Sequence, residues 1–192
     1  ALLVVKIGGP SVKPYQPPGV WEAIAMNVSN TRSYEADQGE GLYRRSMYTF
    51  WKRMAPPASM DIFNAPTREY CVVRRERTNT PLQALATLND EQFLEAARYL
   101  AQQALEAEST FEGRVAFVAH RVVARDFRPE ELDVIRDSLA RLETHYAAHP
   151  EDAAALLEIG YSPANAALPA SESAAWTMLV NQLMNLDEVL NK

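Results

Sequence analysis

Helical periodicity from residue 79 onward is the feature that most constrains the fold of this chain. Pro81 stands where a first-turn proline is favoured, with Asn79 or Thr80 as its capping residue. Further start signals recur at Asp90, Thr110, Pro129, Pro150 and about Ser171. Apolar residues follow these signals at helical spacing, so residues 79–192 are predicted to form a helical bundle with short connections.

Apolar stripes on the expected helices indicate where the core lies. On the last helix the stripe consists of Trp176, Leu179, Leu183 and Leu186. The first helix has an apolar side made of Leu82, Leu85 and Leu88. The last stripe is predicted to face the core.

Residues 1–78 have a different character, because they hold nine of the seventeen aromatic residues and little long periodicity. The predicted fold is therefore mainly α, with an extended, proline- and aromatic-rich N-terminal arm. A short β-hairpin of about 44–53 with 70–75 fits the β-branched and aromatic content. A helix from Gly41 through Met54 is the alternative.

Charge and hydropathy argue against general nucleic-acid binding and against a membrane span. A net charge of −6 argues against nucleic-acid binding. The apolar runs are far shorter than the ~20 residues that cross a bilayer. Basic residues nevertheless gather between positions 44 and 77, at Arg44, Arg45, Lys52, Arg53, Arg68, Arg74, Arg75 and Arg77.

Few residues suit a metal or a cofactor. Cys71 is the only cysteine, which excludes an internal disulfide, a cysteine-rich zinc site and a haem attachment motif. His145 and His149 have metal-ligand spacing, but no carboxylate completes an H-E-x-x-H pattern. No metal site and no cofactor are predicted within these residues.

Several stretches together resemble one family. These are "GGPSVKPYQPPGVWE", "GLYRRSMYTFWKR", "PPASMDIFNAPTRE", "RRERTNTPLQAL" and "AAWTMLVNQLMNLDEVL". In this order they resemble the C-terminal domain of large planctomycete and verrucomicrobial proteins, the planctomycete-specific domain of PSD-one type, domain of unknown function fifteen fifty-three. The resemblance extends over essentially the whole chain, although Glu91 stands where the family often has proline. The start inside the apolar run "ALLVV", without Met, predicts a fragment of a longer protein.

The resemblance implies a setting but no reaction. Its members are typically exported, and they usually carry a cytochrome c-like domain and a second planctomycete-specific domain upstream. The implied location is extracytoplasmic, and any haem would lie in the upstream domains. Since the family's activity is not established, no catalytic residue is carried over.

The opening stretch and the segment that follows it contain candidate binding residues. Prolines stiffen residues 8–22, so Tyr15 and Trp21 would clamp the arm onto the fold, or Lys13, Tyr15 and Gln16 would line a groove for a sugar or peptide. The segment also has the composition of an aromatic and cationic wall, made of Tyr48, Phe50, Trp51, Lys52 and Arg53.

A helix start behind several arginines is a candidate anion site. Free N–H groups at such a start attract anions, and arginine side chains bind them through charge-assisted hydrogen bonds. The residues in question are Arg74, Arg75, Arg77 and Asn79. Ordinary helix capping explains Asn79 or Thr80 equally well.

Two functions of different class remain. The favoured one is a non-catalytic interaction module that binds its upstream domains and a surface polysaccharide. The alternative is part of an oxidoreductase or hydrolase whose site is completed by an upstream region. A pocket in which Asp37, Glu40, Arg44 and Lys52 converge would favour the enzyme, and a flat aromatic surface would favour the module.

Overall fold

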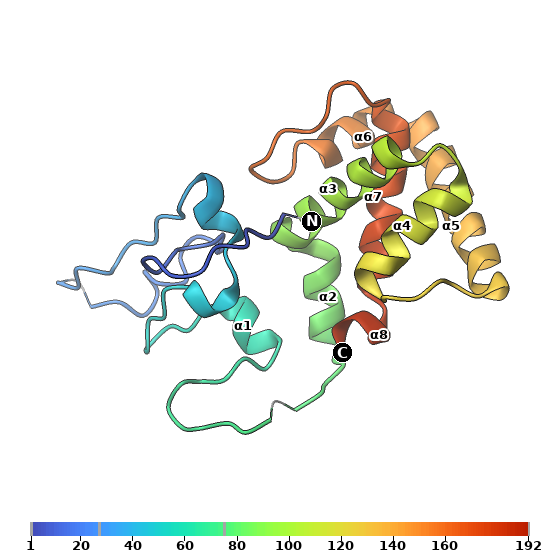
Figure 1. The fold of residues 1–192 in the computed structure, drawn as a ribbon. Helices are drawn as coiled ribbons and strands as arrows, with labels where there is room; N and C mark the ends of the chain where they lie inside the picture. The colour runs from blue at the N-terminus through green and yellow to red at the C-terminus, as the bar shows by residue number, and fades with distance from the viewer. Residues whose placement is uncertain (1, 27, 75, 192) are drawn as a thin grey trace. The chain divides into compact units, whose positions relative to one another are not determined.

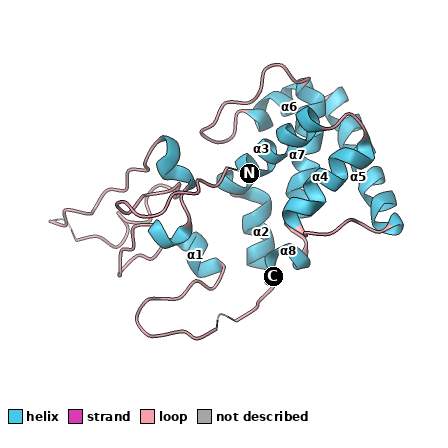
Figure 2. Cartoon of the chain, in the orientation of Figure 1, coloured by secondary structure: helices cyan, strands magenta, loops and turns pink. Residues whose placement is uncertain are grey.

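The computed structural model describes residues 2–26, 28–74 and 76–191. In these ranges the regular elements are helices, and no strand is present (Figure 2). The mainly helical fold class is thus confirmed. The chain divides into two compact units, Leu2–Thr78 and Asn79–Lys192, and each is described here by itself.

The Asn79–Lys192 unit is a bundle of helices with short connections (Figure 1). In chain order its helices are α2 (Pro81–Asn89), α3 (Glu91–Ala107), α4 (Phe111–Val122), α5 (Pro129–Ala148), α6 (Pro150–Leu157), α7 (Ala170–Met184) and α8 (Asp187–Leu190). None of the helices in the described ranges is both long and apolar enough to cross a membrane.

Side-chain caps fix the starts of α2, α3 and α4, as the sequence predicts. The Thr80 hydroxyl accepts from the Gln83 amide at 3.2 Å, and the Gln83 side chain accepts from the Thr80 amide at 3.0 Å. Asp90 caps α3 through the Gln92 amide, and Thr110 caps α4 through the Gly113 amide. These caps satisfy N–H groups that a helix start otherwise leaves unpaired.

Helix α7 forms the centre of the bundle, where it packs against α2, α3, α4, α5 and α6 (Figure 1). Its Trp176, Leu179 and Leu183 are buried, so the predicted stripe is confirmed for these three residues. Leu186, however, remains 37% exposed. Leu186 does not continue the buried stripe because α7 ends at Met184 and Leu186 is the N-cap residue of α8.

Helix α2 turns its polar side inward, in contrast to the apolar side noted in its sequence. Leu82 and Leu85 are exposed, whereas Gln83 and Thr87 are buried. Polar contacts with the α7 region replace apolar packing: the Asn181 amide donates to the Thr87 carbonyl at 2.9 Å, and Thr87 Oγ1 lies 2.7 Å from Asn185 Oδ1.

A buried ion pair on α3 holds the segment that follows α6. Glu95 accepts hydrogen bonds from the amides of Tyr161 and Ser162, at 3.0 and 2.6 Å. Arg98, 3.8 Å from Glu95, donates to the carbonyls of Leu157 and Ser162. Since each charge is buried with polar partners, the pair fixes the course of this segment.

The Leu2–Thr78 unit consists mostly of loops. Its regular elements are two 3-10 helices, η1 (Gly39–Tyr43) and η2 (Ser46–Tyr48), and the short helix α1 (Ala58–Ile62). Isolated parallel bridges join the opening stretch to the segment after η1, between Val4 and Arg44 and between Val12 and Thr49.

The predicted hairpin of 44–53 with 70–75 is wrong. Segment 44–53 pairs with the opening stretch instead: Val12 donates to the Tyr48 carbonyl at 2.8 Å and accepts from the Phe50 amide at 2.7 Å. The helix η2 interrupts any longer ladder. Residues 70–74 are exposed, and Arg75 lies outside the described residues.

Candidate functional site

The indole of Trp21 organises the Leu2–Thr78 unit. It is 2% exposed and contacts Tyr34 edge-on, with ring centroids 4.8 Å apart. Phe50 lies 5.7 Å away, and the ammonium groups of Lys13 and Lys52 lie 5.9 and 4.6 Å from the indole. We call Lys13, Trp21, Tyr34, Phe50 and Lys52 the Trp21 cluster.

Hydrogen bonds to backbone groups hold the cluster residues in place. Asp37 binds both backbone groups of Lys13: its amide donates to the Lys13 carbonyl at 2.8 Å, and its carboxylate accepts from the Lys13 amide at 2.9 Å. The Tyr34 hydroxyl donates to the Pro14 carbonyl. The Lys52 ammonium donates to the Thr31 carbonyl at 2.7 Å. Both lysines thus contribute cation–π attraction to a covered aromatic ring.

Residues 50–53 alternate between two neighbourhoods, as extended backbone requires. Phe50 and Lys52 contact Trp21. Trp51 lies under the Arg68 guanidinium at 4.8 Å, and Arg53 forms a two-pronged ion pair with Glu69 at 2.7 Å. Trp51 and Arg53 therefore do not join Lys52 in one wall.

Three further candidates, Tyr15 and Gln16 of the opening stretch and Arg44, also pack within this unit. Tyr15 and Gln16 are half-buried, and the Gln16 side-chain nitrogen is buried without a hydrogen-bond partner among the described residues. Arg44 donates to the carbonyls of Lys6 and Gly8, at 3.0 and 2.7 Å, and stacks 4.0 Å from the Tyr48 ring. This geometry is that of an arm docked on its own unit.

The candidate anion site already has a carboxylate of the protein at Asn79. Arg74 and Arg77 are exposed, and Arg75 lies outside the described residues. The Asn79 amide donates to Asp187 at 2.7 Å, so a carboxylate of the protein already binds this group.

The four residues that would favour an enzyme have separate partners. Asp37 binds the Lys13 backbone, Glu40 forms an ion pair with Lys6 at 3.4 Å, and Arg44 and Lys52 bind backbone carbonyls as described. Each of the four side chains therefore has a partner of its own within this unit.

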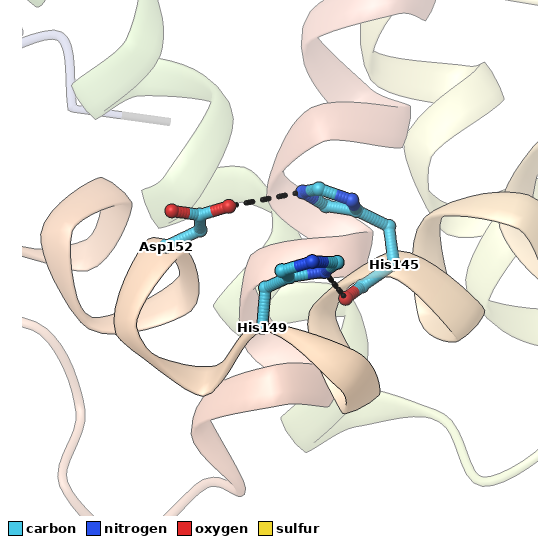
Figure 3. A group of neighbouring side chains, drawn as sticks. All are labelled: His145, His149 and Asp152. Carbon is cyan, nitrogen blue, oxygen red and sulfur yellow. Dashed lines mark hydrogen bonds and ion pairs between the residues drawn. The ribbon is translucent and has the colours of Figure 1, made fainter.

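One group escaped sequence reasoning. Asp152 in the first turn of α6 lies beside His145 and His149, at the junction with α5 (Figure 3). The relevant signal is the spacing H-x3-H-P-x-D. A search within one helix misses it, because Pro150 begins a new helix between the second histidine and the carboxylate.

These observations define a mainly helical protein whose loop-rich unit closes around a tryptophan. A family profile described as PSD1, protein of unknown function (DUF1553), matches residues 1–139. The chain therefore belongs to the PSD1 (DUF1553) family. The match ends within α5, so the quoted resemblance of the α7 region remains a prediction. No curated protein and no solved structure matches the chain.

Proposed function

We propose that this chain is a non-catalytic interaction module of an exported, cytochrome c-associated protein, and that its partner is the upstream domains of the same protein. The supporting observation is a row of exposed apolar side chains on the opening arm. Leu3, Val5 and Ile7 are 53%, 77% and 94% exposed. Val4, between them, is tied to the unit through its amide, which donates to the Tyr43 carbonyl at 2.9 Å.

The alternation of side chains along an extended segment explains why these three residues form one surface. Successive side chains of an extended segment point to opposite sides, so Leu3, Val5 and Ile7 share one side. Contiguous exposed apolar groups are characteristic of interaction sites. A partner that covers the three side chains would gain about 25 cal/mol for each Å² removed from water.

The same unit carries most of the exposed apolar residues in the described part of the chain. Of the sixteen large hydrophobic residues that are exposed there, eleven lie in Leu2–Thr78. Besides the arm these are Ile24, Met26, Val28, Met47, Met54, Tyr70, Val72 and Val73. A protein partner therefore accounts for this unit better than a soluble substrate does.

A polysaccharide partner has less support. Sugar rings stack on an open aromatic face, but Trp21 is covered and Trp51 lies under Arg68. We also propose export, an extracytoplasmic location and a haem in the upstream domains. These three proposals rest on the family resemblance and not on a site in this chain.

The proposal is tested by adding the purified upstream region to the 192-residue chain and measuring affinity by isothermal titration calorimetry. Val5→Asp and Ile7→Asp are each expected to weaken binding at least tenfold without lowering stability, because a charge opposes burial of an exposed side chain only in the complex. Val134→Asp on α5 is the matched control, since Val134 is similarly exposed. Undetectable binding of the wild type, or equal binding by all three variants, would overturn the proposal.

A further inference from the structure

The corner between α5 and α6 brings three metal-ligating side chains together (Figure 3). His145 belongs to the last turn of α5, and His149 is the residue between the two helices. Pro150 lacks a backbone N–H group and begins α6. The chain turns at His149, with φ −130° and ψ 72°, and this turn brings Asp152 back beside the two imidazoles.

Their spacing is close to that of a tetrahedral metal site. His145 Nε2 lies 3.3 Å from Asp152 Oδ2, and one ligand atom from each of the three residues lies within 4.8 Å of the others. Two donors about 2.0–2.1 Å from a tetrahedral zinc ion are roughly 3.3–3.4 Å apart. The His145–Asp152 pair is already at this separation. The His149 ring is stacked on the His145 ring, with centroids 4.7 Å apart, so coordination requires the His149 ring to turn toward the other two donors.

A hydrogen bond determines which nitrogen of the second histidine is available to a metal. His149 Nδ1 lies 3.0 Å from the backbone carbonyl of His145. A carbonyl only accepts, so Nδ1 carries the proton and the neutral ring keeps its free electron pair on Nε2. Metal-ligating histidines commonly have their other nitrogen bound in this way.

We propose that His145, His149 and Asp152 bind one divalent transition-metal ion, with Zn²⁺ as the preferred ion. Two imidazoles and one carboxylate are a ligand set that suits zinc, and water fills the fourth position. The bound ion joins the end of α5 to the first turn of α6. The sequence predicts no metal site because no carboxylate completes the histidine pattern within one helix. In the structure, Asp152 of α6 provides that carboxylate.

An ordinary ion pair between a protonated His145 and Asp152 is the competing explanation. The chain contains a built-in comparison, because His120 Nε2 lies 2.8 Å from Asp126 Oδ1 at an exposed position of the same helical unit. That pair has the same chemistry but no third ligand in the described residues. If the proposal is correct, the two histidine–carboxylate pairs differ in their response to zinc.

The test measures zinc binding to the 192-residue chain by isothermal titration calorimetry with zinc chloride, after treatment with a chelator. A Cys71→Ser background removes the exposed thiol, which is itself a zinc ligand. We expect one zinc per chain, a melting temperature that rises with zinc and returns with EDTA, and at least tenfold weaker binding in His149→Ala and in Asp152→Asn. His120→Ala should bind zinc as the parent does.

Two results would overturn the proposal: no zinc uptake at millimolar zinc, or uptake that both His149→Ala and Asp152→Asn retain. Because both positions are exposed, the variants are expected to fold, and their far-UV circular dichroism checks this. His149 lies between the two helices and Asp152 belongs to α6, so a local defect caused by one substitution alone does not reproduce the expected pattern.

Discussion

At the residue scale, Trp21 shows how a segment with few regular elements acquires a fixed structure. Prolines stiffen the opening stretch, but stiffness alone does not place it. The indole contacts side chains from three separate parts of the unit, represented by Lys13, Tyr34 and Phe50. The Leu2–Thr78 unit has few backbone ladders, so this ring carries much of its stability.

Trp21→Ala is therefore expected to destabilise the unit by about 3–5 kcal/mol, the usual loss when a large buried aromatic side chain is removed. Amide hydrogen exchange at Val12 and Phe50 measures this loss as a free energy of opening, because both amides bond within the unit. Trp51→Ala is the control and should cost less than half as much, since Trp51 is only partly buried. Equal losses would show that Trp21 has no special role.

Gly160 offers a second test on a single residue. Its φ is +96°, and a Cβ added there would lie 2.8 Å from Glu95 side-chain carbons. Gly160→Ala should therefore cost clearly more than the roughly 1 kcal/mol of left-handed backbone alone. Gly19→Ala isolates that backbone term, because Gly19 has φ +87° and open space around it. Urea denaturation of both variants provides the comparison, and an equal cost would mean that the Glu95 contact yields easily.

At the element scale, helix starts are the best-predicted part of the fold. Thr80, Asp90 and Thr110 cap the helices expected of them, because capping depends on side chains only a few residues away. The burial of α2 was not predictable in the same way. Its inward face depends on Asn181 and Asn185, which lie almost a hundred residues further along the chain.

Contacts outside the local segment also explain why the hairpin prediction was wrong and why the His145, His149 and Asp152 group was not predicted. Segment 44–53 has strand-like composition, but its partner depends on the fold of the whole unit, and in that fold the partner is Val12. The residues of the Trp21 cluster were candidates from composition, while their grouping around one buried ring required the fold. Asp152 was missed because it belongs to a different helix from His145.

The C-terminal end of α7 provides a test of where the bundle core ends. Leu183→Ala is expected to cost about 2–5 kcal/mol, since Leu183 is buried in the bundle core. Leu186→Ala should cost less than half of this, because Leu186 lies beyond the end of α7 and is partly exposed. Thermal and urea denaturation measure both. A larger loss at Leu186 would mean that the core extends past Met184.

The start of α5 is expected to be sensitive to acid. The Arg125 guanidinium, which donates to Glu131 at 2.9 and 3.0 Å, and the Arg128 backbone amide together lower the pKa of Glu131 from 4.5 to about 2. A lowered folded-state pKa contributes stability above about pH 4.5, and this contribution is lost as pH falls through about 2. The same arginine also binds Glu188 of α8 at 2.8 Å.

The stability difference between wild type and Glu131→Gln should therefore shrink as pH falls from 4.5 to 2. Urea denaturation at several pH values measures it, and NMR titration reports the carboxyl group directly. Arg125→Met should return the pKa of Glu131 toward its ordinary value, since it removes the main partner. A difference that stays constant over this range would contradict the assignment.

At the scale of the whole molecule, the main apolar core lies entirely within the helical unit. Every member of this core, from Ala97 to Leu183, belongs to Asn79–Lys192. A fragment of residues 79–192 is therefore expected to fold alone, with a cooperative thermal transition and a near-UV signal from Trp176. Helical far-UV dichroism without that near-UV signal would indicate a loosely packed state and contradict the expectation.

The central position of α7 has a consequence for the order in which the protein acquires its structure. Residues 170–184 follow every helix that α7 packs against, from α2 to α6. A ribosome adding about 5–20 residues per second makes the earlier helices several seconds before the helix that unites them. During that interval their core-facing side chains lack their central partner.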